Sequence, residues 1–400
     1  MSIRNHSVSV SISLLVCFNS HSQVGIFTIG DLPGDNTISH ASDVSANGSV
    51  VIGNGVPAGG GTASFRWTAD VGMIEIPGVP GGSFYESTNL SPSGNYVVGR
   101  YTRPGGGGTL SYIWSESAGT VPLGDLSGGA EYTLVSAVSD AGVAVGSSTI
   151  GVTSTGARLN RAAIWTMSGG IEALPLPHPN DENSQSTALD ILADGRIFGQ
   201  SASGSWLYSV DDGFEYLPVG SYLQNINSDA SFMLGAKSVP GELFPLRATY
   251  WTPDTGEVEL APYSPDQNYG AGFMSDDGSI IIGSQQDVGL LVWIDQGSPV
   301  LFEDYVRSVG VDLDGWTITS VADISADGTT IVGTAYHEDW FSGGGPPVRL
   351  EAFVMTIPAP STFLAFAAIG GLLSRRHRSI ETTYPSSPNP RGRDDTLCHS

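Results

Sequence analysis

Seven glycines divide most of this chain into units of similar length, and each glycine ends a short apolar run rich in Val and Ile. They are Gly53, Gly99, Gly146, Gly199, Gly235, Gly283 and Gly333, and neighbouring members lie 36 to 53 residues apart. A period of this size is typical of propellers and other arrays in which one small unit is stacked repeatedly. The repeat therefore constrains the fold more than any other feature of the sequence.

The first complete unit predicts four strands. Ser42–Ser45 alternates polar and apolar residues, Asn47-Gly48 is a strong two-residue hairpin signal, and Val50–Ile52 is a β-branched run. Ala63–Trp67 supplies a third strand and Gly72–Ile76 a fourth. Four antiparallel strands in a unit of this length correspond to one propeller blade.

The two ends of the array distinguish a closed ring from an open stack. The last unit supplies three strands, around Val321–Ala326, Thr329–Gly333 and Glu351–Ile357, and lacks a fourth. Ile26–Gly34 precedes the first unit and matches the end of the second, Val121–Gly128. We therefore predict an all-β, seven-bladed propeller over residues 25–357, with the N-terminal strand completing the last blade. An open β-solenoid is the alternative.

Composition agrees with many short strands and limits the partners. The chain has 53 Gly, 24 Pro and 14% charged residues, so little helix is expected. Cys17 and Cys398 lie outside the repeats and indicate no disulfide framework. Residues 25–357 carry 10 basic and 37 acidic side chains, a net charge of −27. This charge argues against nucleic acid or an anionic membrane as the main partner.

Residues 1–24 have the pattern of a signal peptide. Arg4 precedes the apolar stretch Val8–Phe18, and the small residues Ser20 and Ser22 stand where a peptidase would cleave. A disordered tail or a misplaced start codon is the alternative, and lipidation at Cys17 is a weaker one. Export and a destination in the cell envelope, outer surface or extracellular matrix are expected.

The C-terminal end carries an apolar segment with a basic end. Thr362–Leu373 is almost wholly apolar and is followed by Arg375, Arg376, His377 and Arg378. As a helix these twelve residues would rise about 18 Å, less than the roughly 30 Å of a bilayer core. We therefore predict that residues 358–378 form a short anchor and that they are the only part of the chain in contact with a membrane. Residues 379–400 are predicted to form a disordered tail.

Two parts of the chain resemble known bacterial sequence families. Pro358, Ala359, Pro360, Ser361, Arg375 and Arg376 resemble a PEP-CTERM sorting tail, although Ala359 replaces the usual Glu and 22 residues follow the basic cluster. The resemblance implies processing by an exosortase-like protease. The repeats resemble extracellular HAF repeats at Ala63–Phe65, Ala162–Ile164 and Glu351–Phe353, without the name-giving His. That resemblance implies a surface location and no particular reaction.

No catalytic signature is present in the sequence. The seven His are scattered without an HExxH pattern, and no glycine-rich phosphate loop precedes a helix. Three segments, Asp43–Gly48, Asp190–Gly195 and Asp323–Gly328, place oxygen ligands before a Gly, as calcium loops do, but they lack a distal Glu. We interpret them as hairpin turns. No catalytic residue and no cofactor are predicted, and Ca²⁺ is the alternative.

The aromatic residue that ends most third strands is interpreted as blade core. It is Trp67, Trp114, Trp165, Trp251 or Trp293, with Tyr208 and Met355 in the remaining units.

Topology places the long connections of a propeller on one face, and long loops on a rigid scaffold usually carry binding. We name this the long-loop face; it comprises the connections from second to third strands and from fourth to first strands. The scarce basic residues and several aromatics fall there, and Arg103, Arg158, Arg161, His337 and Trp340 are the predicted ligand-binding residues. Ordinary solvated loop residues are the alternative.

These observations predict an exported, non-enzymatic binding or structural module that contacts polysaccharide or an envelope protein. The alternative is a carbohydrate-active enzyme, a glycosidase or lyase, with its site in the central pocket.

Overall fold

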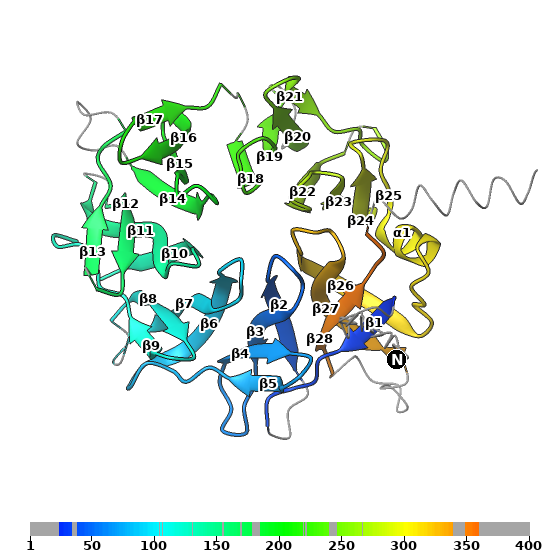
Figure 1. Cartoon of the computed structure of the whole chain (residues 1–400), viewed down its shortest axis with the longest axis horizontal. Helices are drawn as coiled ribbons and strands as arrows, with labels where there is room; N and C mark the ends of the chain where they lie inside the picture. Colours follow the sequence, from blue (N-terminus) through cyan, green and yellow to red (C-terminus); the bar gives the residue numbers. More distant parts are fainter. Residues whose placement is uncertain are drawn as a thin grey trace, which may run out of the picture. The chain divides into compact units, whose positions relative to one another are not determined.

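The structure is a computed structural model that describes Val24–Ala359, apart from residues 34–37, 104, 106, 130, 154–155, 169, 178–184, 219, 221, 240–245, 266 and 339–348. Within this part, seven four-stranded antiparallel sheets follow one another around a ring (Figure 1). The predicted seven-bladed propeller is confirmed.

Each blade begins with an inner strand, the one nearest the centre of the ring (Figure 1). For blades one to seven the inner strands are β2 (Ser39–Val44), β6 (Ser83–Leu90), β10 (Thr133–Val138), β14 (Ser186–Ile191), β18 (Tyr222–Ile226), β22 (Tyr269–Met274) and β26 (Trp316–Ile324). The second strands are β3 (Val50–Gly55), β7 (Tyr96–Thr102), β11 (Val143–Val152), β15 (Ile197–Ser201), β19 (Met233–Ser238), β23 (Ile280–Gln285) and β27 (Thr330–His337).

The third and fourth strands complete the blades toward the rim. The third strands are β4 (Ala63–Thr68), β8 (Thr109–Ser115), β12 (Arg158–Thr166), β16 (Gly204–Ser209), β20 (Leu246–Thr252), β24 (Gly289–Ile294) and β28 (Glu351–Thr356). The outer strands of blades one to six are β5 (Gly72–Glu75), β9 (Gly119–Pro122), β13 (Gly170–Ala173), β17 (Gly213–Tyr216), β21 (Gly256–Glu259) and β25 (Val300–Leu301).

The outer strand of blade seven comes from the start of the chain. Strand β1 (Gly25–Thr28) pairs antiparallel with β28, so that Gly25 lies opposite Thr356. The contact continues past the strand, because the Ile29 N–H donates to the Ala352 carbonyl at 3.0 Å. Leu32 is buried in the cluster between blades seven and one. The predicted ring closure by the N-terminal strand is therefore confirmed.

Every inner strand contains a β-bulge at the same place. The pairing register with the second strand shifts by one residue after Ala41, Ser87, Val135, Ala188, Leu223, Ala271 and Val321. In each blade the residue just before the shift lies opposite the repeated glycine, as Ala41 lies opposite Gly53. A bulge adds local twist and redirects the side chains that follow it.

The bulge explains why the repeated position is glycine. A Cβ on Gly53 would collide with the backbone carbonyl oxygen of His40, and one on Gly283 with that of Gly270. The same collision with an inner-strand carbonyl would occur in other blades, at Gly99, Gly146, Gly199 and Gly333. The sequence period therefore records a close backbone approach and not a turn.

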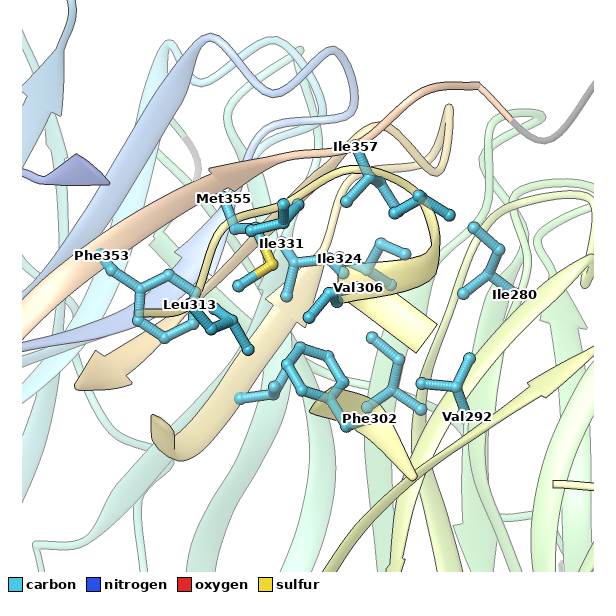
Figure 2. Close-up of a cluster of buried hydrophobic side chains, with 14 of the residues drawn as sticks. Ile280, Val292, Phe302, Val306, Leu313, Ile324, Ile331, Phe353, Met355 and Ile357 are labelled. Atoms are coloured by element: carbon cyan, nitrogen blue, oxygen red, sulfur yellow. The ribbon is translucent and has the colours of Figure 1, made fainter. Parts of the chain in front are cut away.

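The helix α1 (Phe302–Ser308) is the one α-helix in the described residues, in agreement with the low helix content expected. The long loops expected from fourth to first strands include residues 302–319 between blades six and seven, and for this connection the expectation is wrong because it contains the helix. Phe302, Val306 and Val309 follow a helical spacing and pack into the cluster between blades six and seven (Figure 2). Strand β26 then begins at Trp316. No helix among the described residues is long and apolar enough to cross a bilayer.

The aromatic positions behave as core, although not equally. Trp165, Trp293 and Met355 are fully buried and Trp114 nearly so, whereas Trp67, Tyr208 and Trp251 are partly buried. These side chains pack with the neighbouring blade, as Trp165 does with Val98 and Leu123 of blade two. The interpretation as blade core is supported by this packing.

The close backbone approach in blade six provides a test with an internal control. Gly283→Ala should destabilise the protein by about 2 kcal/mol, because its Cβ has no space beside the Gly270 carbonyl. Gly270→Ala should change stability by less than about 0.5 kcal/mol, because its Cβ would meet no atom within 4 Å. Urea unfolding of both variants measures the difference. Equal effects would contradict the explanation of the glycine period.

Candidate functional site

Two regions of the propeller combine accessible space with side chains suited to a ligand. One lies on the long-loop face where blades one and two meet, and the other is the central channel. The sequence pointed to the long-loop face as a whole, and it identified the carboxylates of the second region only as parts of hairpin turns.

The first region is built around a second irregularity in β6. Ser83 lies opposite Thr102 and Glu86 lies opposite Arg100, so one extra residue is accommodated between them. Phe84 occupies this bulge with φ of 52°, a left-handed conformation that is rare for an aromatic residue. Its side chain is 66% exposed. The backbone thus holds a large apolar ring in solvent at an energetic cost.

A cavity of about 330 Å³ lies beside Phe84. Two connections form its walls, Pro57–Thr62 from blade one and Gly78–Tyr85 between the blades, and Glu75 adds a carboxylate. The Tyr85 hydroxyl donates to the Val79 carbonyl at 2.5 Å, and its ring stacks on Tyr101 at 6.1 Å between centroids. The ring of Tyr85 is therefore held in place at one end of the cavity.

Arginines continue this surface toward blade three, and they are paired. Arg100 Nε donates to Glu86 Oε2 at 2.6 Å, and Arg103 forms an ion pair with Glu131. The Arg158 guanidinium lies 3.7 Å from the ring centroid of Tyr132. The two ion pairs lower the net positive charge that Arg100 and Arg103 offer to an anionic ligand.

Of the five predicted ligand-binding residues, the four that the structure describes do not all belong to the same blade. Arg103 and Arg158 meet consecutive residues, Glu131 and Tyr132, and so lie in one sector. His337 belongs to blade seven, where its ring packs edge-on against Trp316 at 5.0 Å. Trp340 lies outside the described residues.

Two residues expected in a loop lie in a strand. Arg158 begins β12, and Arg161 lies further along it opposite Ser148 of β11. The pairing of β11 with β12 continues as far as Val152 opposite Arg158, so both arginines lie in the hairpin. Burial lowers the pKa of Arg161, which is half-buried in the strand and not in a solvated loop.

The second region is the central channel, which is bordered by the seven inner strands. Because every inner strand bulges at the same place, the residues after the bulges occupy equivalent positions around the channel. The residue that follows each bulge is equivalent in all seven blades. In order these residues are Asp43, Asn89, Ala137, Asp190, Asn225, Phe273 and Asp323. Several of them connect adjacent blades through the backbone of the next inner strand. Asp43 accepts from Leu90 N–H at 2.7 Å, and Asn225 donates to the Gly272 carbonyl at 3.2 Å.

Asp43 and Asp323 converge on one backbone donor. The Val44 N–H donates to Asp43 Oδ1 at 2.8 Å and to Asp323 Oδ2 at 3.3 Å. Burial, together with the adjacent Asp323 carboxylate, raises the pKa of Asp43 well above its usual value, and burial also raises the pKa of Asp323. Two neighbouring buried carboxyl groups cannot both ionise easily, so ionisation of the pair is disfavoured relative to two separate exposed carboxyl groups.

Asp190 stands apart from this pair. Its Oδ1 accepts from the Ile191 N–H at 2.7 Å, and burial raises its pKa to about 7, with a further contribution from the charge of Asp43. Asp190 lines a cavity of about 150 Å³ with Asn89, Ser136 and Asn225. A carboxyl group that titrates near neutrality beside an accessible polar cavity can act as hydrogen-bond donor or acceptor.

In the three segments interpreted as hairpin turns, the Asn or Asp that precedes the Gly does form a turn. Asn47 Oδ1 accepts from Ser49 N–H at 3.1 Å, Asp194 from Arg196 at 2.9 Å and Asp327 from Thr329 at 3.0 Å. The first Asp of each segment instead lies directly after the bulge of its inner strand. Among the described residues no three His, Cys, Asp or Glu side chains are arranged to hold a metal ion.

Of the predicted sorting residues, Pro358 and Ala359 follow β28, and the other four lie outside the described residues. The predicted signal peptide precedes the described part of the chain, with the exception of Val24.

No family model matches the sequence, and no curated protein matches it. Solved propellers are similar in fold. A chain of a mitotic checkpoint complex shares 11% identity with a TM-score of 0.48, and the match covers 90% of this chain and 98% of that one. An oligogalacturonate lyase from Vibrio parahaemolyticus shares 14% identity with a TM-score of 0.48, covering 85% and 95%. These distant likenesses concern architecture alone.

Sequence reasoning missed Phe84 and the role of the channel aspartates for different reasons. The left-handed backbone at Phe84 has no signature in the sequence beyond the preceding Gly81-Gly82-Ser83. The channel aspartates do have a signal, because each lies four residues before the Asn or Asp of a hairpin turn, on a strand that propeller topology places innermost.

The raised pKa of Asp190 makes stability depend on pH. The folded state retains this proton up to about pH 7, whereas the ordinary pKa is 3.8. Ionisation therefore lowers the free energy of unfolding as pH rises through this window, by about 4 kcal/mol at most. Asp190→Asn should raise the melting temperature relative to wild type at pH 8, and this difference should shrink toward zero at pH 4.

Thermal unfolding at both pH values measures the effect. Asp211→Asn, in the exposed turn before β17, controls for the loss of one charge. A difference between wild type and Asp190→Asn that is the same at pH 4 and pH 8 would contradict this assignment.

Proposed function

We propose that this protein is an exported, non-enzymatic binding module that holds neutral polysaccharide on the long-loop face of blades one and two. The observation that carries the proposal is Phe84, a strained and exposed aromatic residue beside a cavity of about 330 Å³. Strain of this kind persists where the surrounding structure enforces it, and it is concentrated at functional sites.

The chemistry of the surface favours a sugar as the ligand. An exposed aromatic ring can stack on the apolar face of a pyranose, and the nearby carboxylates of Glu75 and Glu86 can accept hydrogen bonds from its hydroxyl groups. An open surface along Phe84, Arg103 and Arg158 suits several residues of a polymer better than a single small molecule.

Charge favours a neutral polymer over an acidic one. Residues 25–357 carry a net charge of −27, and the arginines Arg100 and Arg103 are paired with glutamates. An acidic polysaccharide would face long-range repulsion and would have to displace these glutamates. A neutral polysaccharide meets neither cost.

The binding surface can be tested without destabilising the fold. Phe84→Gly removes the ring and places at φ of 52° the residue that adopts this conformation most easily, so the variant should retain or gain stability. Binding to a neutral polysaccharide on a glycan array should weaken at least about tenfold, as expected for an aromatic anchor.

Val210→Ala is the matched control, because Val210 is an exposed apolar residue in the turn between β16 and β17 on the opposite face. Unchanged binding in Phe84→Gly, or stronger binding to acidic than to neutral glycans, would refute the proposal.

Export is supported by the character of the two ends. The stretch Val8–Phe18 after Arg4 suits a leader, and the PEP-CTERM-like segment at residues 358–378 suits a sorting signal read by an exosortase-like protease. The likeness of the repeats to HAF repeats agrees with a place in the envelope or extracellular matrix.

Mass spectrometry of the native protein tests export. We expect the N-terminus to begin near Val24 and the C-terminus to end upstream of Ser400 in the envelope or extracellular fraction. An intact Met1 and an intact Ser400 on a cytosolic species would contradict export.

A carbohydrate-active enzyme is the second candidate function, and the channel carboxylates are the observation that favours it. Glycoside cleavage requires acidic groups with separated pKa values. Asp190, with a pKa of about 7, and the separate Asp43–Asp323 pair provide titratable groups on the inner strands of one ring. Release of new reducing ends from a bound polysaccharide would establish this function in place of simple binding.

A further inference from the structure

The wall of the central channel is recessed at blade six. In six blades the residue inserted by the inner-strand bulge carries a side chain; these residues are Ser42, Thr88, Ser136, Leu189, Gln224 and Ala322. In blade six it is Gly272, and Gly270 lies two residues before it. A Cβ at either glycine would meet no atom within 4 Å. These glycines therefore leave space and are not required by backbone contacts.

The recess is part of a cavity of about 370 Å³ with mainly apolar walls. Phe273, Ile282 and Leu290 line it, and Thr319 and Ser320 of β26 border it. Its volume lies within the range of small-ligand sites.

A polar wall begins where this cavity ends. Gln224 borders both the 370 Å³ cavity and the 150 Å³ cavity lined by Asn89, Ser136, Asp190 and Asn225. The two cavities therefore adjoin at Gln224. Asp190 Oδ1 accepts from Ile191, whereas Oδ2 has no hydrogen-bond partner within the described part of the chain.

We propose that the channel binds one neutral polyhydroxylated ring, a pyranose or a cyclitol, between the recess of blade six and the Asp190 wall. The apolar side suits the C–H face of such a ring, and the amide and carboxyl groups suit its hydroxyl edge. A metal ion is a poorer match, since the described chain places no three carboxylate, His or Cys ligands together. An anion is disfavoured by Asp190.

This site goes beyond the proposed function, because a single ring is enclosed in the channel whereas a polymer lies along the outer loops. The two hypotheses use different residues. Phe84 contributes to the loop surface and not to the lining of either channel cavity.

The test uses the full chain and four probes: glucose, galactose, mannose and myo-inositol. Saturation-transfer NMR and isothermal titration calorimetry should detect binding of at least one probe by the wild-type protein. Gly272→Leu should weaken that binding about tenfold or abolish it by filling the recess, and the nearly isosteric Asp190→Asn should weaken it through the polar wall.

Gly151→Leu is the matched control, because a Cβ at Gly151 in β11 would also meet no atom within 4 Å, and this residue lies on the long-loop face. It should bind the probe as wild type does, and so should Phe84→Gly. Thermal unfolding confirms that each variant is folded. No binding of any probe by wild type, or equal binding by wild type, Gly272→Leu and Asp190→Asn, would overturn the proposal. Loss of polymer binding in Phe84→Gly with the probe still bound separates the two sites.

Discussion

The close approach between two backbones in each blade is the contact on which the rest of the propeller depends. Where the inner strand bulges, its carbonyl oxygen occupies the place that a Cβ would need on the second strand, as at Gly53 and Gly283. The bulge turns the next side chain toward the channel and the following blade. One local constraint therefore sets the glycine period, the lining of the channel and part of the contact between blades.

Ring closure depends on residues that are far apart in the sequence. Strand β1 pairs with β28, and the tight turns of blades seven and one are also joined, with Asp327 N–H donating to the Ala46 carbonyl at 3.4 Å. Similar turn contacts occur between other blades, such as Ala46 N–H to the Pro92 carbonyl at 2.9 Å. Both candidate ligand regions therefore rest on a scaffold in which each blade is restrained by its neighbours.

Much of the fold could be predicted from the sequence, because its determinants are local and repeated. Asn47-Gly48 specifies a hairpin and Val50–Ile52 specifies a buried strand. Ile26–Gly34, which has the sequence of a fourth strand but precedes the first unit, reveals ring closure. The candidate site could be predicted only in part. Arg103 and Arg158 were identified from residue type and loop position, and both contact the same short segment. Their pairing with Glu131 and Tyr132 depends on the distance between blades, which no local pattern contains.

The helix α1 was missed for a related reason. An interpretation based on the repeat assigns any segment between blades to a loop, whereas Phe302 and Val306 are held by burial between blades six and seven (Figure 2). The strained backbone of Phe84 is likewise a product of tertiary structure, since the register of β6 against β7 places it. Features that depart from the repeat, such as the bulge at Phe84, distinguish one blade from another. The functional hypotheses are based on features of this kind.

The central claim is that ligand binding resides on the long-loop face of blades one and two. Hydrogen exchange of the full chain, with and without a neutral polysaccharide fragment, tests it most directly. We predict slower exchange at residues 57–62 and 78–86 in the complex, with little change in the turns at residues 45–49 and 275–279. Protection confined to those turns, or no protection at residues 78–86 under saturating ligand, would contradict the account.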